Sequence, residues 1–142
     1  MASKSSRNEL VRGLRESAAG IAVLQSLWPS AFPQKGHLVR PLVSGIIGPI
    51  AERTGWSPRY TAGVLQGWKL RRAYCDAVLR YSHRFTLDGK EVADAVVEDA
   101  AREQARNQLA RIAARRKAGQ RKVEGALQAA EAAEDKTQAA DG

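Results

Sequence analysis

The spacing of apolar residues predicts a chain built mainly from short helices. From residue 20 onward, apolar side chains recur at helical intervals until a proline ends the pattern: Ile21, Leu24, Trp28 and then Pro29. This spacing predicts a buried helix over residues 20–28. Residues 1–19 are polar and show little periodicity, so we expect them to form a loosely attached N-terminal arm.

A second helix is predicted to open at Arg40-Pro41-Leu42, because a proline in the first turn lacks only an N–H that would be unpaired anyway. Its buried face would hold three apolar residues: Leu42, Ile46 and Ile50. Pro49 falls inside this pattern and cannot donate to the carbonyl four residues back. We therefore expect a kink or a division of the helix at this point.

Two further helices are predicted after Gly55. Ser57 and Pro58 are the residue types of an N-cap and of a first helical position, which predicts a helix over residues 58–66. Its buried side should hold Thr61, Val64, Leu65 and Trp68. Gly67 is expected to separate it from a helix over residues 70–80. That helix carries five residues on one face: Leu70, Ala73, Tyr74, Ala77 and Val78.

The next segment changes from helical spacing to alternation. Residues 84–87 alternate and Asp88-Gly89 is a strong turn signal, which together predict a small β-hairpin. Asp94 is expected to cap a long final helix. Its apolar stripe is Val96, Val97, Ala100, Ala101, Ala105, Leu109 and Ile112. Beyond Gly119 the chain is Ala-rich without bulky residues, so we expect a disordered tail that is transiently helical. The predicted fold class is mostly α, with one small β-hairpin.

Basic residues are concentrated in two parts of the chain. The net charge is +8; residues 35–90 hold ten Lys or Arg against three acidic residues, and residues 101–122 hold eight against one. The last twenty residues, from Val123, reverse this balance with five acidic residues against Lys136. Four aromatic residues lie among the cations of the first part: Tyr60, Trp68, Tyr74 and Tyr81. That mixture suits phosphates and bases, whereas residues 101–122 alone could equally form a solvated helix face. We expect a polyanion partner, most often nucleic acid.

The sequence offers almost no catalytic arrangement. His37 and His83 have no carboxylate pattern of a known mechanism, and Cys75 lies beside Asp76, which would raise its pKa. No set of Cys and His has the spacing of zinc ligands. We expect a protein that is not an enzyme and needs no cofactor or metal. A single cysteine, a polar start and the lack of a long apolar run favour a reduced, cytoplasmic setting over secretion or membrane insertion.

Residues 51–65 look like a helix-turn-helix, with a Gly-containing turn ahead of a capped helix. In a DNA-binding transcriptional regulator of that kind, Arg59, Tyr60 and Thr61 would enter the major groove. The pattern has low specificity, because any two packed helices joined by a glycine turn produce it. The Tyr74 helix and the hairpin that follow directly afterwards fit it poorly.

A longer succession of motifs extends over most of the chain. It comprises Leu27-Trp28-Pro29 with Phe32, Arg40-Pro41-Leu42 with Gly45-Ile46, a helix led by Ser57, then Tyr74, and Arg84 ahead of Leu87-Asp88-Gly89. This succession resembles the ProQ/FinO family of bacterial RNA chaperones over about residues 20–112, and its spacing from Gly45 to the hairpin turn needs no gaps. The chain departs from the usual family pattern at Val43, Pro49, Lys69 and Leu70.

The resemblance implies a compact, mostly helical domain that binds structured RNA at the base of a stem-loop followed by a 3′ single-stranded tail, as in intrinsic terminators. Many such proteins promote the pairing of small or antisense RNAs with their targets. It also implies RNA contacts for Arg40, Tyr74 and Arg84, with Tyr74 in the pocket that takes the RNA 3′ end. Periodicity alone would place Tyr74 in the core, and Arg40 could simply support the fold.

Charge and alternation add further candidates. Arg84 should point away from Phe85 and Leu87, leaving its guanidinium free for phosphate. Three cations crowd the start of the predicted Tyr74 helix, where free backbone N–H groups favour an anion. The full set of candidate RNA-binding residues is Tyr74, Arg84, Arg40, Lys69, Arg71, Arg72, Arg59, Arg80 and Lys90.

Three parts of the chain are expected. They are a polar arm over residues 1–19, an RNA-binding domain over residues 20–112, and a basic then acidic, disordered extension over residues 113–142. The predicted partners are structured RNAs, including small RNAs and mRNA 3′ ends. We expect a monomer with no membrane partner and no small-molecule substrate.

Overall fold

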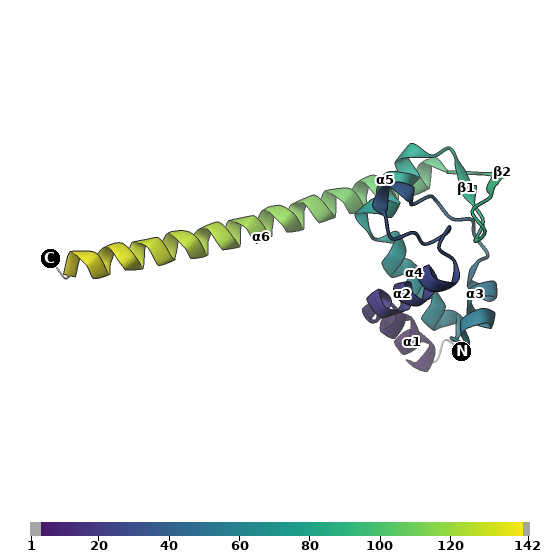
Figure 1. Ribbon diagram of the computed structural model, residues 1–142, viewed down its shortest axis with the longest axis horizontal. Helices are drawn as coiled ribbons and strands as arrows, with labels where there is room; N and C mark the ends of the chain where they lie inside the picture. The colour runs from purple at the N-terminus through teal and green to yellow at the C-terminus, as the bar shows by residue number, and fades with distance from the viewer. Residues whose placement is uncertain (1–3, 141–142) are drawn as a thin grey trace. The chain divides into compact units, whose positions relative to one another are not determined.

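The computed structural model describes residues 4–140, with side chains described for residues 8–130. The chain divides into two compact units, Met1–Gln108 and Leu109–Gly142. The described residues form α1 (Lys4–Arg15), α2 (Ser17–Leu27), the 3₁₀ turn η1 (Gly36–Leu38), α3 (Ile47–Thr54), α4 (Pro58–Lys69), α5 (Arg72–Arg80), β1 (His83–Phe85), β2 (Glu91–Val96) and α6 (Asp99–Ala140). Figure 1 labels the α-helices and the two strands. The mostly α fold class with one small hairpin is confirmed.

Helix α1 packs tightly against α4, where loose attachment was expected. A Cβ atom at Gly13 would overlap the Tyr60 carbonyl oxygen, and one at Gly63 would overlap the Leu10 carbonyl oxygen. The two backbones can approach this closely only because both positions are glycine. The prediction of a loosely attached arm is therefore wrong for α1.

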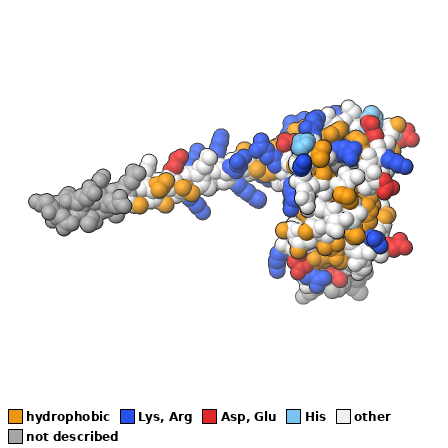
Figure 2. Space-filling model, viewed as in Figure 1, with side chains coloured by type: hydrophobic (Ala, Val, Ile, Leu, Met, Phe, Trp, Pro, Cys, Tyr) orange, Lys and Arg blue, Asp and Glu red, His pale blue; other side chains and the backbone are white. Residues whose placement is uncertain are grey.

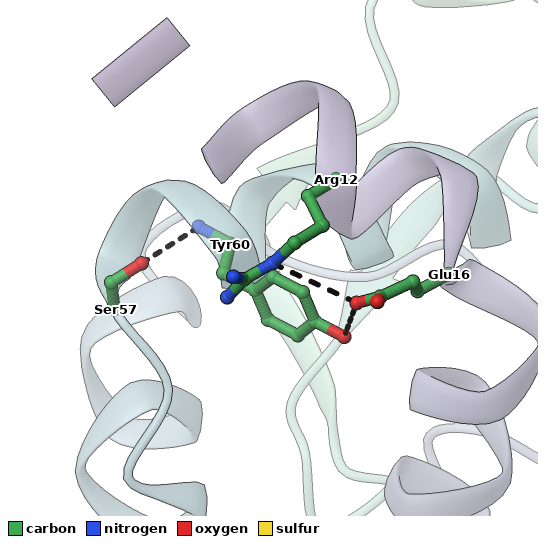
Figure 3. A network of polar contacts seen from close by, with 4 residues as sticks. All are labelled: Arg12, Glu16, Ser57 and Tyr60. Atoms are coloured by element: carbon green, nitrogen blue, oxygen red, sulfur yellow. Dashed lines mark hydrogen bonds and ion pairs between the residues drawn. The ribbon is translucent and has the colours of Figure 1, made fainter. Parts of the chain in front are cut away.

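A polar network fastens the same two helices, as Figure 3 shows. The Tyr60 hydroxyl donates to a Glu16 carboxylate oxygen at 2.7 Å, and the Arg12 guanidinium lies over the Tyr60 ring, 5.0 Å from its centroid. Arg12 Nε also lies 3.8 Å from Glu16. Partial burial, and then the Glu16 carboxylate, raise the pKa of Tyr60. Ser57 Oγ accepts the Tyr60 N–H at 3.1 Å, which confirms Ser57 as the N-cap of α4.

The core lies where α2, α3 and α5 meet α4. The residues predicted to line it are buried: Ile21, Leu24, Leu42, Ile46, Ile50, Thr61, Val64, Leu65, Trp68, Tyr74, Ala77 and Val78. Phe32 joins them and meets the Trp68 ring edge-on, at 5.4 Å between centroids. Three predicted members are not buried: Leu70 is 37% exposed at the C-cap of α4, and Trp28 and Ala73 are half-buried.

The segment before α3 is extended, so the prediction of a helix opening at Arg40-Pro41-Leu42 is wrong. Leu42 pairs with Phe85 in a parallel bridge: the Phe85 N–H donates to the Pro41 carbonyl at 2.8 Å and the Val43 N–H donates to the Phe85 carbonyl at 3.0 Å. The apolar spacing identified buried residues correctly but not their backbone. Pro49 falls in the first turn of α3, where no N–H is needed.

Gly67 lies inside α4 and does not end it, contrary to the sequence prediction. A Cβ atom there would overlap the side chain of Ser17, so the glycine provides close packing between α2 and α4. The helices α4 and α5 separate instead at Leu70 and Arg71, where the Arg71 backbone becomes extended.

The hairpin is confirmed, with Arg84 opposite Val92, Phe85 opposite Glu91, and Gly89 at φ 82° in the turn. Strand β2 continues to Val96, so Asp94 lies in a strand and does not cap the last helix. Helix α6 begins at Asp99 and runs as one helix to Ala140. The helix spans the tail for which the sequence predicts disorder with transient helicity, and that disorder stays a prediction.

Candidate nucleic-acid interface

A pocket of about 510 Å³ lies in the first compact unit. Its lining comes from the 43–45 loop, the start of α3, one side of α4, α5, Arg84 of β1, and the first turns of α6. The α4 residues of the pocket, including Ala62 and Gln66, are centred about 130° around the helix axis from Gly63 and Gly67. Helix α1 and the pocket therefore lie against different sides of α4.

The charged residues of this lining are two cations, Lys69 and Arg84, and none of the described lining residues is acidic. The pKa of Lys69 is lowered first by burial and then by the positive charge of Arg84. Two neighbouring cations without a carboxylate repel each other, and an anion placed between them relieves that repulsion. The pocket therefore favours an anionic ligand.

Arg84 is half-buried and is partly engaged by the fold. Its Nη1 donates to the Leu42 carbonyl oxygen at 3.0 Å. Alternation in the sequence predicted a free guanidinium, and this bond corrects that prediction. A guanidinium has five N–H donors, so one bond orients Arg84 and leaves other donors for a ligand in the pocket.

Tyr74 belongs both to the core and to the pocket lining. Its side chain is 5% exposed, and its hydroxyl oxygen accepts the Leu42 N–H at 3.2 Å. Burial raises the pKa of Tyr74, against the opposing effects of the Leu42 N–H and of Arg84. The phenol is thus protonated at neutral pH and can still donate one hydrogen bond. Tyr74 and Arg84 together bind the N–H and the carbonyl of Leu42, the residue before Val43 of the pocket lining.

Arg40 does not line the pocket; it holds the hairpin turn against a neighbouring loop. Its guanidinium donates to the carbonyls of Gly89 and Ser30, each at 3.4 Å, and lies 4.6 Å from the centroid of the Phe85 ring. These contacts give Arg40 a role in the fold.

The other predicted cations lie outside the pocket on exposed positions. Arg71 lies over the Trp68 ring, Arg72 is 3.8 Å from Asp76, and Arg80 donates to the His37 carbonyl at 3.3 Å. Arg59 and Lys90 are exposed as well. The structure brings Lys69, Tyr74 and Arg84 together and leaves the other six outside this lining: Arg40, Arg59, Arg71, Arg72, Arg80 and Lys90.

A second, smaller hollow of about 50 Å³ lies at the start of α5. Arg71, Ala73 and Trp68 line it, and the buried Trp68 Nε1 has no hydrogen-bond partner among the described residues. The first-turn N–H groups of α5 are also free of helical partners. The hydrogen-bond donors near the start of α5 are therefore the Arg71 guanidinium, the Trp68 Nε1–H and these backbone N–H groups.

Sequence reasoning missed the polar amides of the pocket. Gln66, Gln104 and Gln108 line it, and Gln108 Nε2 donates to the Leu70 carbonyl at 3.0 Å. Gln104 and Gln108 are four residues apart, one turn of α6, beside the predicted apolar residues Ala101 and Ala105. That i, i+4 spacing was the signal that could have identified them.

The helix-turn-helix interpretation fails on the residues it needs. Thr61 is 0% exposed, and the Tyr60 hydroxyl is engaged by Glu16. Neither side chain is available to enter a DNA groove from this fold. Arg59 alone of the three is exposed.

Cys75 and His83, the residues considered for catalysis, have contacts that belong to the fold. The pKa of Cys75 is raised by burial first and by Asp76 second, and His83 Nδ1 lies 3.2 Å from a Glu91 carboxylate oxygen. Within the described residues, no cluster of His, Cys, Asp and Glu could hold a metal ion. None of the described helices is long and apolar enough to cross a membrane.

Comparison with protein families matches residues 14–122 to the ProQ/FINO family. The chain belongs to the ProQ/FinO family. This is a family of non-enzymatic, RNA-binding proteins, so membership supports an RNA-binding chaperone as the general function of this ProQ/FinO protein. The comparison with curated proteins found no match.

Proposed function

We propose that this protein is an RNA chaperone that binds stem-loops ending in a 3′ single-stranded tail, such as intrinsic terminators, and serves post-transcriptional regulation by small or antisense RNAs. The observation that carries the proposal is the pocket in which Tyr74, Lys69 and Arg84 meet without any acidic residue among its described lining. Its partners would be small RNAs and mRNA 3′ ends in the cytoplasm, bound by a monomer without a cofactor.

In this proposal the RNA 3′ end enters the pocket. Arg84 holds a backbone phosphate through its remaining N–H donors, which a fixed fork geometry makes directional. Lys69 neutralises a second phosphate. The Tyr74 hydroxyl donates to a ribose or phosphate oxygen, and the apolar walls, including Leu65 and Val78, receive the base.

The base of the stem would lie at the start of α5. Arg71 and Arg72 flank that end of the helix, and its unpaired N–H groups add positive potential for a phosphate. The exposed side chains of Arg59, Arg80 and Lys90 would contribute longer-range attraction. Arg40 would act on RNA only through the hairpin turn it supports.

Competition binding tests the proposal. The full chain is incubated at moderate salt with a labelled terminator hairpin carrying a 3′ tail, and duplex DNA of equal charge is added. Both bind through counterion release, so both affinities fall with salt. We expect the tailed hairpin to remain bound. Displacement by a defined duplex DNA site would instead support a DNA-binding regulator.

A further inference from the structure

One segment of α6 carries most of its positive charge on one side of the helix. Residues 111–122 hold six Lys or Arg and no acidic residue. All of these cations are exposed, and among the described side chains none of them forms an ion pair. Figure 2 shows Lys and Arg side chains projecting from α6. This positive charge is available to a partner.

The helical repeat arranges five of the six cations in two rows. At about 100° per residue, Arg111, Arg115 and Lys122 fall within about 40° of one another, and Lys117 and Arg121 form a second row. Both rows fit within an arc of about 160°, along roughly 16 Å of helix. Arg116 is the sixth cation and points to the opposite side.

Small residues occupy the space between the two rows. Ala114 and Ala118 lie there, so the centre of the cationic side carries nothing larger than a methyl group. An alanine between cations lets the helix backbone approach a surface while the flanking side chains reach outward on both sides.

We propose that this side of α6, defined by Arg111, Arg115, Lys117, Arg121 and Lys122 around Ala114 and Ala118, binds the backbone of an RNA duplex across its shallow groove. The inference rests on the proposed RNA-binding function and adds a second site to it. A duplex presents two phosphate rows separated by a groove, which matches two cation rows with a flat centre. The A-form minor groove is wide and shallow, and proteins read it by shape and backbone contacts.

Two neighbouring arginines provide a matched test. Arg115→Gln and Arg116→Gln remove the same charge at adjacent positions of the full chain, on opposite sides of α6. We would measure affinity for a blunt RNA duplex as a function of salt. We expect Arg115→Gln to reduce the slope of log affinity against log salt by about 0.7 to 0.9, with a smaller change for Arg116→Gln. Equal changes would overturn the proposal, because they would show diffuse attraction without a preferred side.

A size probe tests the flat centre without changing charge. Ala118→Leu should lower affinity for the blunt duplex by roughly threefold or more, whereas Ala113→Leu, about 120° away from the centre, should leave it unchanged. Alanine and leucine are both good helix formers, and circular dichroism checks that each variant retains the helix. Unchanged binding by Ala118→Leu would contradict the close approach. The same loss on a single-stranded RNA would contradict the preference for duplex.

Failure of this inference differs from failure of the proposed function. If wild-type protein binds the tailed hairpin but Arg115→Gln and Arg116→Gln behave alike, the second site is wrong and the pocket stands. If the wild-type chain does not bind the tailed hairpin, the proposed function fails whatever the α6 variants do.

Discussion

The pocket of the compact unit and the cationic side of α6 both carry positive charge, but they hold it differently. In the pocket, the Leu42 carbonyl orients Arg84, and burial lowers the pKa of Lys69. The five cations on the proposed side of α6 are all exposed. Fixed charges can select a ligand by geometry, whereas mobile charges mainly add affinity that salt removes. We infer that RNA choice belongs to the pocket and general RNA affinity to α6.

Replacing Arg84 should have the largest effect. Loss of a charge-assisted phosphate contact costs about 1.5 to 3 kcal/mol, so Arg84→Ala should weaken binding of the tailed hairpin roughly tenfold to a hundredfold. The lost bond to the Leu42 carbonyl should also lower stability, by about 1 to 3 kcal/mol. Binding assays and thermal melts separate the two effects. Unchanged affinity in a folded Arg84→Ala protein would remove it from the site.

Tyr74→Phe sharpens the comparison further, because it removes only the hydroxyl. The buried Leu42 N–H would lose its acceptor, which should lower stability by about 1 to 3 kcal/mol. Tyr81→Phe is the matched control, since Tyr81 packs edge-on against Phe85 through its ring.

We expect Tyr74→Phe to lower both the melting temperature and RNA affinity, because the hydroxyl accepts the Leu42 N–H and, in the proposal, donates to RNA. Three other outcomes are also readable. A lower melting temperature with intact binding would make the hydroxyl purely structural. Weaker binding at unchanged stability would assign it to RNA. No change in either would leave only the ring, and Tyr74→Ala would then have to lower affinity beyond its loss of stability.

Truncation after Ile112 should remove affinity without removing discrimination. Most of the cations on α6 are lost, so every RNA should bind more weakly, with a salt slope smaller by roughly one unit or less per lost contact. Ratios of affinity between tailed and untailed hairpins should persist. A truncated protein that no longer distinguishes the two would show that α6 also selects RNA.

The smallest expected effect is a pH dependence. Because the pKa of Lys69 is lowered, its charge is lost at a lower pH than that of an ordinary lysine. RNA affinity should therefore decline as pH rises toward the lowered pKa of Lys69. Lys69→Arg keeps the charge and should flatten this decline, as measured by fluorescence anisotropy over a pH series that starts at neutrality and rises. A decline that persists in Lys69→Arg would exclude Lys69 as its cause.

Sequence patterns identified buried residues better than backbone paths. Leu42, Ile46 and Ile50 are all buried at helical spacing, yet Leu42 belongs to an extended segment paired with Phe85. Burial depends on side-chain type, whereas that pairing joins residues more than forty positions apart. Gly67 shows the same limit, because only the tertiary contact with Ser17 explains a glycine inside α4.

The candidate site was predictable only in part. Tyr74 and Arg84 were singled out through a family resemblance, and the structure brings them together with Lys69. The hydrogen bonds that Tyr74 and Arg84 form with Leu42 could not be predicted. They depend on the extended backbone around Leu42, which the sequence pattern assigned to a helix. The RNA contact that the family resemblance implied for Arg40 stays a prediction, and in the structure its guanidinium contacts Gly89, Ser30 and Phe85.

The central claim is that the pocket containing Arg84 receives the RNA 3′ tail. The most direct test is a double comparison of wild-type and Arg84→Ala protein, each binding one hairpin with and without its tail. We predict that removing the tail weakens binding strongly in wild type and much less in Arg84→Ala, because the two changes remove the same interaction. An equal effect of tail removal in both proteins would contradict the account.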